Sequence, residues 1–135
     1  MTTTTSTRYG VFIDIEGSLD DVRPRVEELL KGEGFGILTE IDVKATMKTK
    51  LDLDVPAQVI LGACNPPLAH RALSNELDVG LLLPCNVTLR DTEEGTTRVG
   101  FLDIEAMVSM VDNPVMDEVA ADVSARFQRI RDALA

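Results

Sequence analysis

Hydrophobic residues recur along the chain at two spacings, every second residue or every third to fourth residue. Short runs with the two-residue spacing, or unbroken apolar runs between turn-forming residues, are typical of β-strands. Residues 91–95 read Asp-Thr-Glu-Glu-Gly, a turn-forming sequence, so the strands on either side of it should form an antiparallel hairpin. The predicted strands are Tyr9–Ile15, Phe35–Val43, Val55–Ala63, Cys85–Arg90 and Thr96–Ile104.

The three-to-four-residue spacing first occurs between Ser18 and Gly32, where it predicts a helix. Pro24 would interrupt the hydrogen bonds of a helix that begins at Ser18. Asp21 is therefore an alternative cap, which would place the proline in the first turn. The segment Asp42–Leu51 also carries apolar residues four positions apart, and it fits either a short amphipathic helix or a continuation of the strand before it.

Asn65 and Asn113 mark two further helix starts because each precedes a proline. An asparagine side chain accepts hydrogen bonds from free backbone amides, and proline is well tolerated in the first turn of a helix. We therefore predict a helix over Pro66–Leu77 and a long C-terminal helix over Pro114–Leu134. Strands with intervening helices indicate an α+β fold.

Length and composition indicate one folded domain. The 135 residues include 44% hydrophobic and 27% charged residues, which are values typical of globular proteins. Residues 1–7 are rich in threonine and are expected to be a flexible N-terminus, followed by a single domain over residues 8–135. No apolar run is long enough to span a membrane, and the N-terminus lacks the pattern of a secretory signal, so we expect a cytoplasmic protein without a membrane partner.

The charge of the chain excludes one class of partner. Thirteen basic and 23 acidic residues give a formal net charge of −10. Such a surface repels the phosphate backbone of nucleic acids, so we expect no nucleic-acid binding.

The candidate chemistry lies in two short segments that contain the two cysteines, Cys64 and Cys85. In a reducing compartment they are expected to be free thiols rather than a structural disulfide. If the strands that carry them run antiparallel, the end of one lies beside the start of the other, and the sulfur atoms could approach each other. If the strands run parallel, the two cysteines lie at opposite ends.

The segments Gly34–Val43, Leu61–Pro66 and Gly80–Val87 resemble the bacterial and archaeal domain of unknown function 302 family, and the likeness extends from about Tyr9 to Leu134. The resemblance implies an α+β fold similar to the TATA-binding-protein-like class. That fold has a curved, mainly antiparallel sheet of the β-α-β-β-β-β-α type, with helices packed on one side and a long C-terminal helix. The resemblance also implies a homodimer, and it implies no established activity.

The leading hypothesis is a non-enzymatic binding or accessory module that works as a homodimer without a cofactor. A modest apolar cleft would hold a small molecule. The residues expected to edge this cleft are Cys64, Asn65, Pro66, Cys85 and Asn86.

The alternative hypothesis is a thiol-dependent redox, sulfur-handling or metal-binding protein. In that case Cys64 would be the reactive thiol and Cys85 would resolve it. A metal site would also need His70 and a carboxylate, because the chain has one histidine and no Cys-x-x-Cys pair. A purely structural role for both cysteines is the third possibility.

Overall fold

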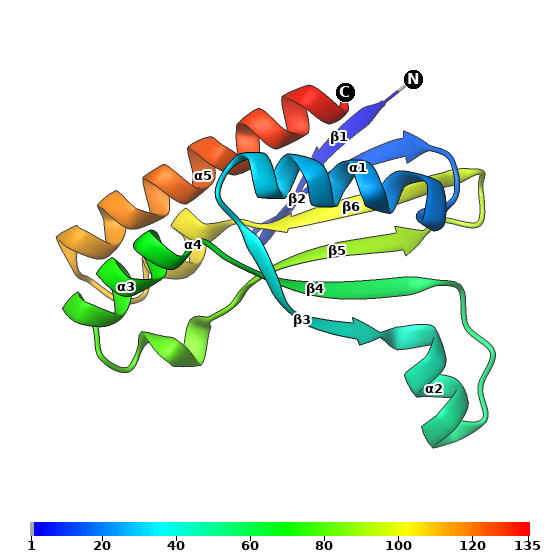
Figure 1. Cartoon of the computed structure of the whole chain (residues 1–135), viewed down its shortest axis with the longest axis horizontal. Helices are drawn as coiled ribbons and strands as arrows, with labels where there is room; N and C mark the ends of the chain where they lie inside the picture. The colour runs from blue at the N-terminus through cyan, green and yellow to red at the C-terminus, as the bar shows by residue number, and fades with distance from the viewer. Residues whose placement is uncertain (1) are drawn as a thin grey trace.

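The computed structural model describes residues 2–135 and places six strands in one sheet (Figure 1). The strand order is β1-β2-β6-β5-β4-β3, and each pair of neighbours runs antiparallel. The α+β fold with an antiparallel sheet, predicted from the sequence, is confirmed. The strands are β1 Thr3–Ser6, β2 Gly10–Glu16, β3 Gly36–Asp42, β4 Gln58–Cys64, β5 Cys85–Asp91 and β6 Thr96–Leu102.

Helices cover one face of the sheet. The long C-terminal helix α5 contacts α1, α3 and α4, and Figure 1 shows α1 and α5 side by side over the strands. The helix α2 projects from the far end of the sheet and has no buried residue. The helices are α1 Leu19–Gly32, α2 Val43–Leu51, α3 Pro66–Asn75, α4 Ile104–Val108 and α5 Pro114–Leu134, with a short 3-10 helix, η1, over Val79–Leu82.

Side-chain caps decide where the helices begin. The Ser18 hydroxyl accepts a hydrogen bond from the backbone amide of Asp21, so α1 begins at Leu19 and the alternative start at Asp21 is wrong. Pro24 lies inside this helix. The Asp42 carboxylate accepts a hydrogen bond from the Ala45 amide at 2.9 Å, and this cap explains why the following segment forms a helix rather than more of the strand.

The N-terminal segment contains a strand that is absent from the predicted elements. Thr3–Ser6 forms β1 and pairs with β2 from Thr3–Asp14 to Ser6–Val11, while the flexibility expected for residues 1–7 stays a prediction and Met1 lies outside the described residues. Threonine is β-branched and favours extended backbone, which explains the strand. The segment has no apolar residues at alternating positions, so the pattern of hydrophobic residues does not predict it.

Three phenylalanine rings join the sheet to the helices. The centroid of the Phe127 ring, on α5, lies 5.1 Å from that of Phe35 and 5.2 Å from that of Phe101 on β6. These distances are typical of favourable aromatic pairs. The rings therefore fix α5 against both the sheet and the turn that precedes β3.

Within residues 2–135, no helix is long and apolar enough to cross a membrane.

A candidate ligand-binding cavity

A cavity of about 390 Å³ lies where β4 and β5 meet the layer formed by α3, α4 and α5. The segment between α3 and β5 forms another part of its wall. Its lining residues are Phe35, Leu38, Thr39, Ala63, Cys64, Asn65, Leu68, Ala69, Ala72, Leu73, Val79, Gly80, Leu83, Pro84, Cys85, Ile104, Met107, Val108, Met116, Val119 and Val123.

The wall of this cavity is almost wholly apolar. Apart from the two thiols, the only polar side chains among its lining residues are those of Thr39 and Asn65. None of the lining residues is an aspartate, glutamate, lysine, arginine or histidine. A charged group placed inside would lose its water without gaining an ionic partner, which is costly. The cavity therefore suits a neutral, apolar ligand or the apolar part of a larger one.

Two leucines mark the opening of the cavity. Leu38 on β3 is 68% exposed and Leu73 on α3 is 39% exposed, although both line the cavity. The pairing of β3 with β4 shifts register between Ile37 and Thr39, so Leu38 lies in a bulge at the edge of the sheet. The opening is thus apolar, like the interior.

Three of the five residues predicted to edge a cleft line this cavity. They are Cys64, Asn65 and Cys85. Pro66 is the exposed first residue of α3, and Asn86 is exposed on β5; neither lines the cavity. Neighbouring side chains in a strand point to opposite faces of the sheet. Cys85 therefore faces the helices, whereas Asn86 faces away from them.

The two cysteines lie on neighbouring antiparallel strands, at the end of β4 and the start of β5. The residue paired with Cys85 is Ala63, and both are buried under the helices. Cys64 is one residue beyond Ala63, at the last position of β4, and its side chain also lines the cavity. The two thiols therefore share one cavity, and they are close enough for the charge of Cys64 to affect the pKa of Cys85.

Burial changes the acidity of one thiol. Its buried position raises the pKa of Cys85 from an ordinary value of 9.0 to about 11, with a smaller contribution from the negative charge that Cys64 would carry. The thiolate of Cys85 is therefore scarce at neutral pH. Since the thiolate is the nucleophilic form, this environment disfavours Cys85 as a partner in thiol exchange.

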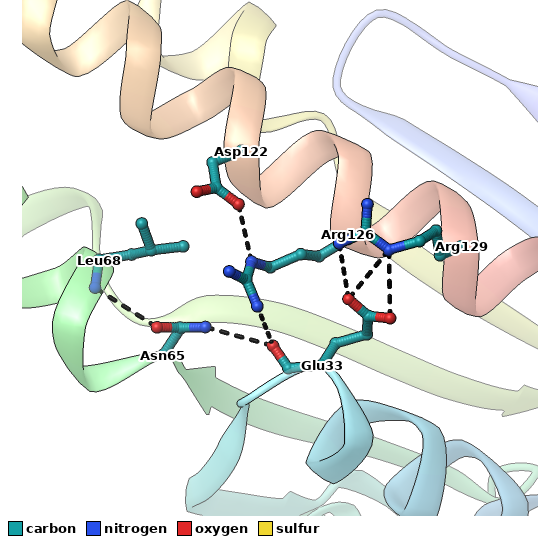
Figure 2. A network of polar contacts seen from close by, with 6 residues as sticks. All are labelled: Glu33, Asn65, Leu68, Asp122, Arg126 and Arg129. Atoms are coloured by element: carbon teal, nitrogen blue, oxygen red, sulfur yellow. Dashed lines mark hydrogen bonds and ion pairs between the residues drawn. The ribbon is translucent and has the colours of Figure 1, made fainter.

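Asn65 holds the end of β4 in place through two hydrogen bonds (Figure 2). Its Oδ1 atom accepts from the backbone amide of Leu68 at 3.4 Å and caps α3, as predicted. Its Nδ2 atom donates to the backbone carbonyl of Glu33 at 3.3 Å, just after α1. Gly34 follows with a φ of +86°, and a Cβ atom there would lie 2.9 Å from the same Nδ2 atom.

Two arginines of α5 complete this polar junction, and no sequence signal indicated them. Arg126 donates to the Glu33 carbonyl at 2.7 Å and also binds Asp122 on its own helix (Figure 2). Arg129 binds the Glu33 carboxylate at 2.7 Å and holds the pKa of that carboxyl below its usual range. The junction joins α1, α3 and α5 beside Asn65, at one end of the cavity.

The residues considered for a metal site are dispersed. Among residues 2–135, no group of three or more histidine, cysteine, aspartate and glutamate side chains is placed to hold a metal ion. His70 is exposed on α3 and is absent from the lining of the cavity.

The fold and the cavity define an α+β domain with an apolar cavity that opens to solvent beside Leu38 and Leu73. Residues 12–134 match the family described as "Domain of unknown function DUF302", so the chain belongs to that family. A crystal structure of an uncharacterized conserved DUF302 protein from Bacillus stearothermophilus is similar, with 34% sequence identity and a TM-score of 0.86. The match covers 96% of this chain and 100% of that chain. No curated protein matches the chain significantly in sequence.

Proposed function

We propose that the protein is a non-enzymatic binding module that holds a neutral, apolar small molecule in the cavity beside Cys64, Asn65 and Cys85. The observation that carries this proposal is a cavity of about 390 Å³ whose wall contains no acidic or basic side chain other than the two thiols. Small-molecule sites usually measure roughly 300–1,000 Å³ and are mostly apolar. The polar junction around Asn65 supports the proposal because it keeps one wall of the cavity in a fixed position.

Filling the cavity is expected to abolish binding without unfolding the protein. Ala69 lies on α3, is half-buried and lines the cavity, so Ala69→Phe places a ring in the space that a ligand would occupy. The neutral fluorescent probe N-phenyl-1-naphthylamine should bind the native protein saturably with enhanced emission. The variant should bind it at least about tenfold more weakly, equivalent to about 1.4 kcal/mol.

A matched control separates cavity filling from a general effect of the added ring. Ala125 is exposed on α5 and does not line the cavity, so Ala125→Phe should bind the probe as the native protein does. In competition, 1-octanol should displace the probe far better than octanoate, because the cavity offers no partner for a carboxylate. Equal probe affinity in both variants, or equal competition by the two compounds, would contradict the proposal.

We also propose that the expected homodimer forms through the edge strand β3, with a second copy of this strand as its partner. The outer edge of β3 has no neighbouring strand among residues 2–135, so its backbone groups are free to extend the sheet. This strand exposes Leu38 and Ile41, whereas the opposite edge strand β1 contains only threonine and serine. An apolar edge is the better candidate for self-association.

A lysine on this edge is expected to convert the dimer to a monomer. Ile41→Lys places a charge where two copies of β3 would meet, and lysine is a common device against edge pairing. Light scattering after size exclusion should give the mass of two chains for the native protein and of one chain for the variant. The control is Leu77→Lys, which changes a residue beyond the end of α3 that is more exposed than Ile41. This variant should stay dimeric. A native monomer, or a dimeric Ile41→Lys variant, would contradict the β3 interface.

A further inference from the structure

Arg131 on α5 is buried although it is charged. Its side chain is 8% exposed, and its guanidinium carbon lies 5.4 Å from the centre of the Phe101 ring. Within residues 2–135 its one side-chain hydrogen bond is donated to Gln128 at 3.0 Å, and no carboxylate lies within salt-bridge distance. A buried arginine normally has an ionic partner or a full set of hydrogen bonds.

The free donors of Arg131 face accessible space. A guanidinium carries five N–H groups, and the bond to Gln128 uses one of them. In the described chain, every fully enclosed side-chain nitrogen or oxygen has a hydrogen-bond partner. The nitrogen atoms of Arg131 that have no partner are therefore not fully enclosed. They belong to a residue that lines a second cavity, of about 300 Å³.

This second cavity lies on the other side of α4 from the apolar one. The helix contributes Ile104, Met107 and Val108 to the first cavity and Glu105 and Ala106 to the second. The second cavity is also bounded by α5, by the start of β2 and by the end of β6. It has an apolar wall, which consists of Val11, Leu102 and Phe127.

The charges around the second cavity have both signs. Asp103 and Glu105 line it together with Arg131, and Ser124 adds a hydroxyl group. Burial lowers the pKa of Arg131 from its ordinary value in spite of the opposing fields of Asp132 and Asp103, so nearby carboxylates do not fully compensate the guanidinium. A simple anion would meet two carboxylates, and a simple cation would meet the arginine. A ligand with both charges would satisfy both sides.

We propose that this cavity binds a small zwitterion of the α-amino-acid class with an apolar side chain. Its carboxylate accepts the free N–H groups of Arg131, for which a planar guanidinium is well suited. Its ammonium group faces Asp103 and Glu105, and its side chain packs against the apolar wall. This site is separate from the apolar cavity, so it stands or falls independently of the function proposed above.

The test is a titration of the full chain with L-leucine, followed by amide chemical shifts in two-dimensional NMR. Leucine should shift the amides of residues that line the second cavity and saturate. Leucine amide lacks the carboxylate and N-acetyl-leucine lacks the cation, so each should bind at least about tenfold more weakly. No saturable shift with leucine, or equal affinity for all three compounds, would overturn the proposal.

Two variants test which residue binds the carboxylate of the ligand and which binds its ammonium group. Arg131→Met should lose leucine binding, whereas Arg90→Met, which changes an exposed arginine of β5, should retain it. Asp103→Asn removes a charge but keeps a good cap for α4, where Asp103 accepts a hydrogen bond from Ala106. This variant should bind leucine more weakly and N-acetyl-leucine about as before, so the preference for leucine should become smaller while Glu105 still faces the ammonium group. Unchanged preference in Asp103→Asn overturns the proposal even if Arg131→Met does not fold.

Discussion

Replacing Phe127 with alanine is expected to lower the free energy of unfolding by about 3–5 kcal/mol, the usual cost of removing a buried phenylalanine ring. Phe127 is 1% exposed and contacts the rings of Phe35 and Phe101, so its loss removes both aromatic pairs as well as buried area. Urea unfolding followed by circular dichroism should show a lower midpoint with an unchanged slope.

The matched control is Phe12→Ala on the uncovered face of the sheet. Phe12 is half-buried and lies across Gly10 and Gly100, where an added Cβ would come within 3.0 Å of its ring atoms. Its removal should cost clearly less, because part of the ring already contacts solvent. If both variants lose a similar free energy of unfolding, the three-ring cluster contributes no more to stability than a half-buried ring does.

The position of Phe127 also connects the two cavities. It lines the second cavity, and its ring contacts that of Phe35, which lines the first, in a tilted arrangement. A cavity left by Phe127→Ala would therefore open between them. For this reason both proposed sites should be tested with variants that leave this ring in place.

Local rules explain what could be predicted from the sequence. The hairpin of β5 and β6 follows from a turn sequence between two strand-like runs, and the starts of α3 and α5 follow from Asn65 and Asn113 with their prolines. These features depend on residues that are close in sequence. The same local rules predict that Cys64 lies between the end of a strand and the start of a helix. In the structure this junction forms part of the cavity wall, which includes Cys64 and Asn65.

Long-range contacts explain what could not be predicted. Glu33 and Arg126 are 93 positions apart, and each carries an ordinary surface side chain as far as the sequence shows. Arg131 looks like one more polar residue of an amphipathic helix, and only the packing of α5 against Phe101 shows that it is buried. Proximity in sequence to the two cysteines predicts Pro66 and Asn86 at the cleft, whereas in the structure both are exposed and neither lines the cavity.

Cys85 is expected to react with a thiol reagent at least about 100-fold more slowly in the folded protein than in the unfolded chain. Its pKa rises from 9.0 to about 11 on folding, and two pKa units remove about 99% of the thiolate at neutral pH. The Cys64→Ser variant isolates this thiol, and mass spectrometry after timed labelling gives its rate. Below the raised pKa, the rate should increase about tenfold for each pH unit.

The same shift makes stability depend on pH. Because the folded state has the higher pKa, the contribution of the neutral Cys85 thiol is fully present below about pH 9.0 and is lost as the pH rises towards 11. Urea midpoints measured from pH 8 to 11 should decline, and the decline should be smaller in Cys85→Ala. Rapid labelling of native Cys85, or a disulfide between Cys64 and Cys85 after mild oxidation, would instead favour the thiol-chemistry hypothesis over the binding module. We expect neither, because burial keeps the Cys85 thiol protonated and so leaves little of the thiolate that both reactions need.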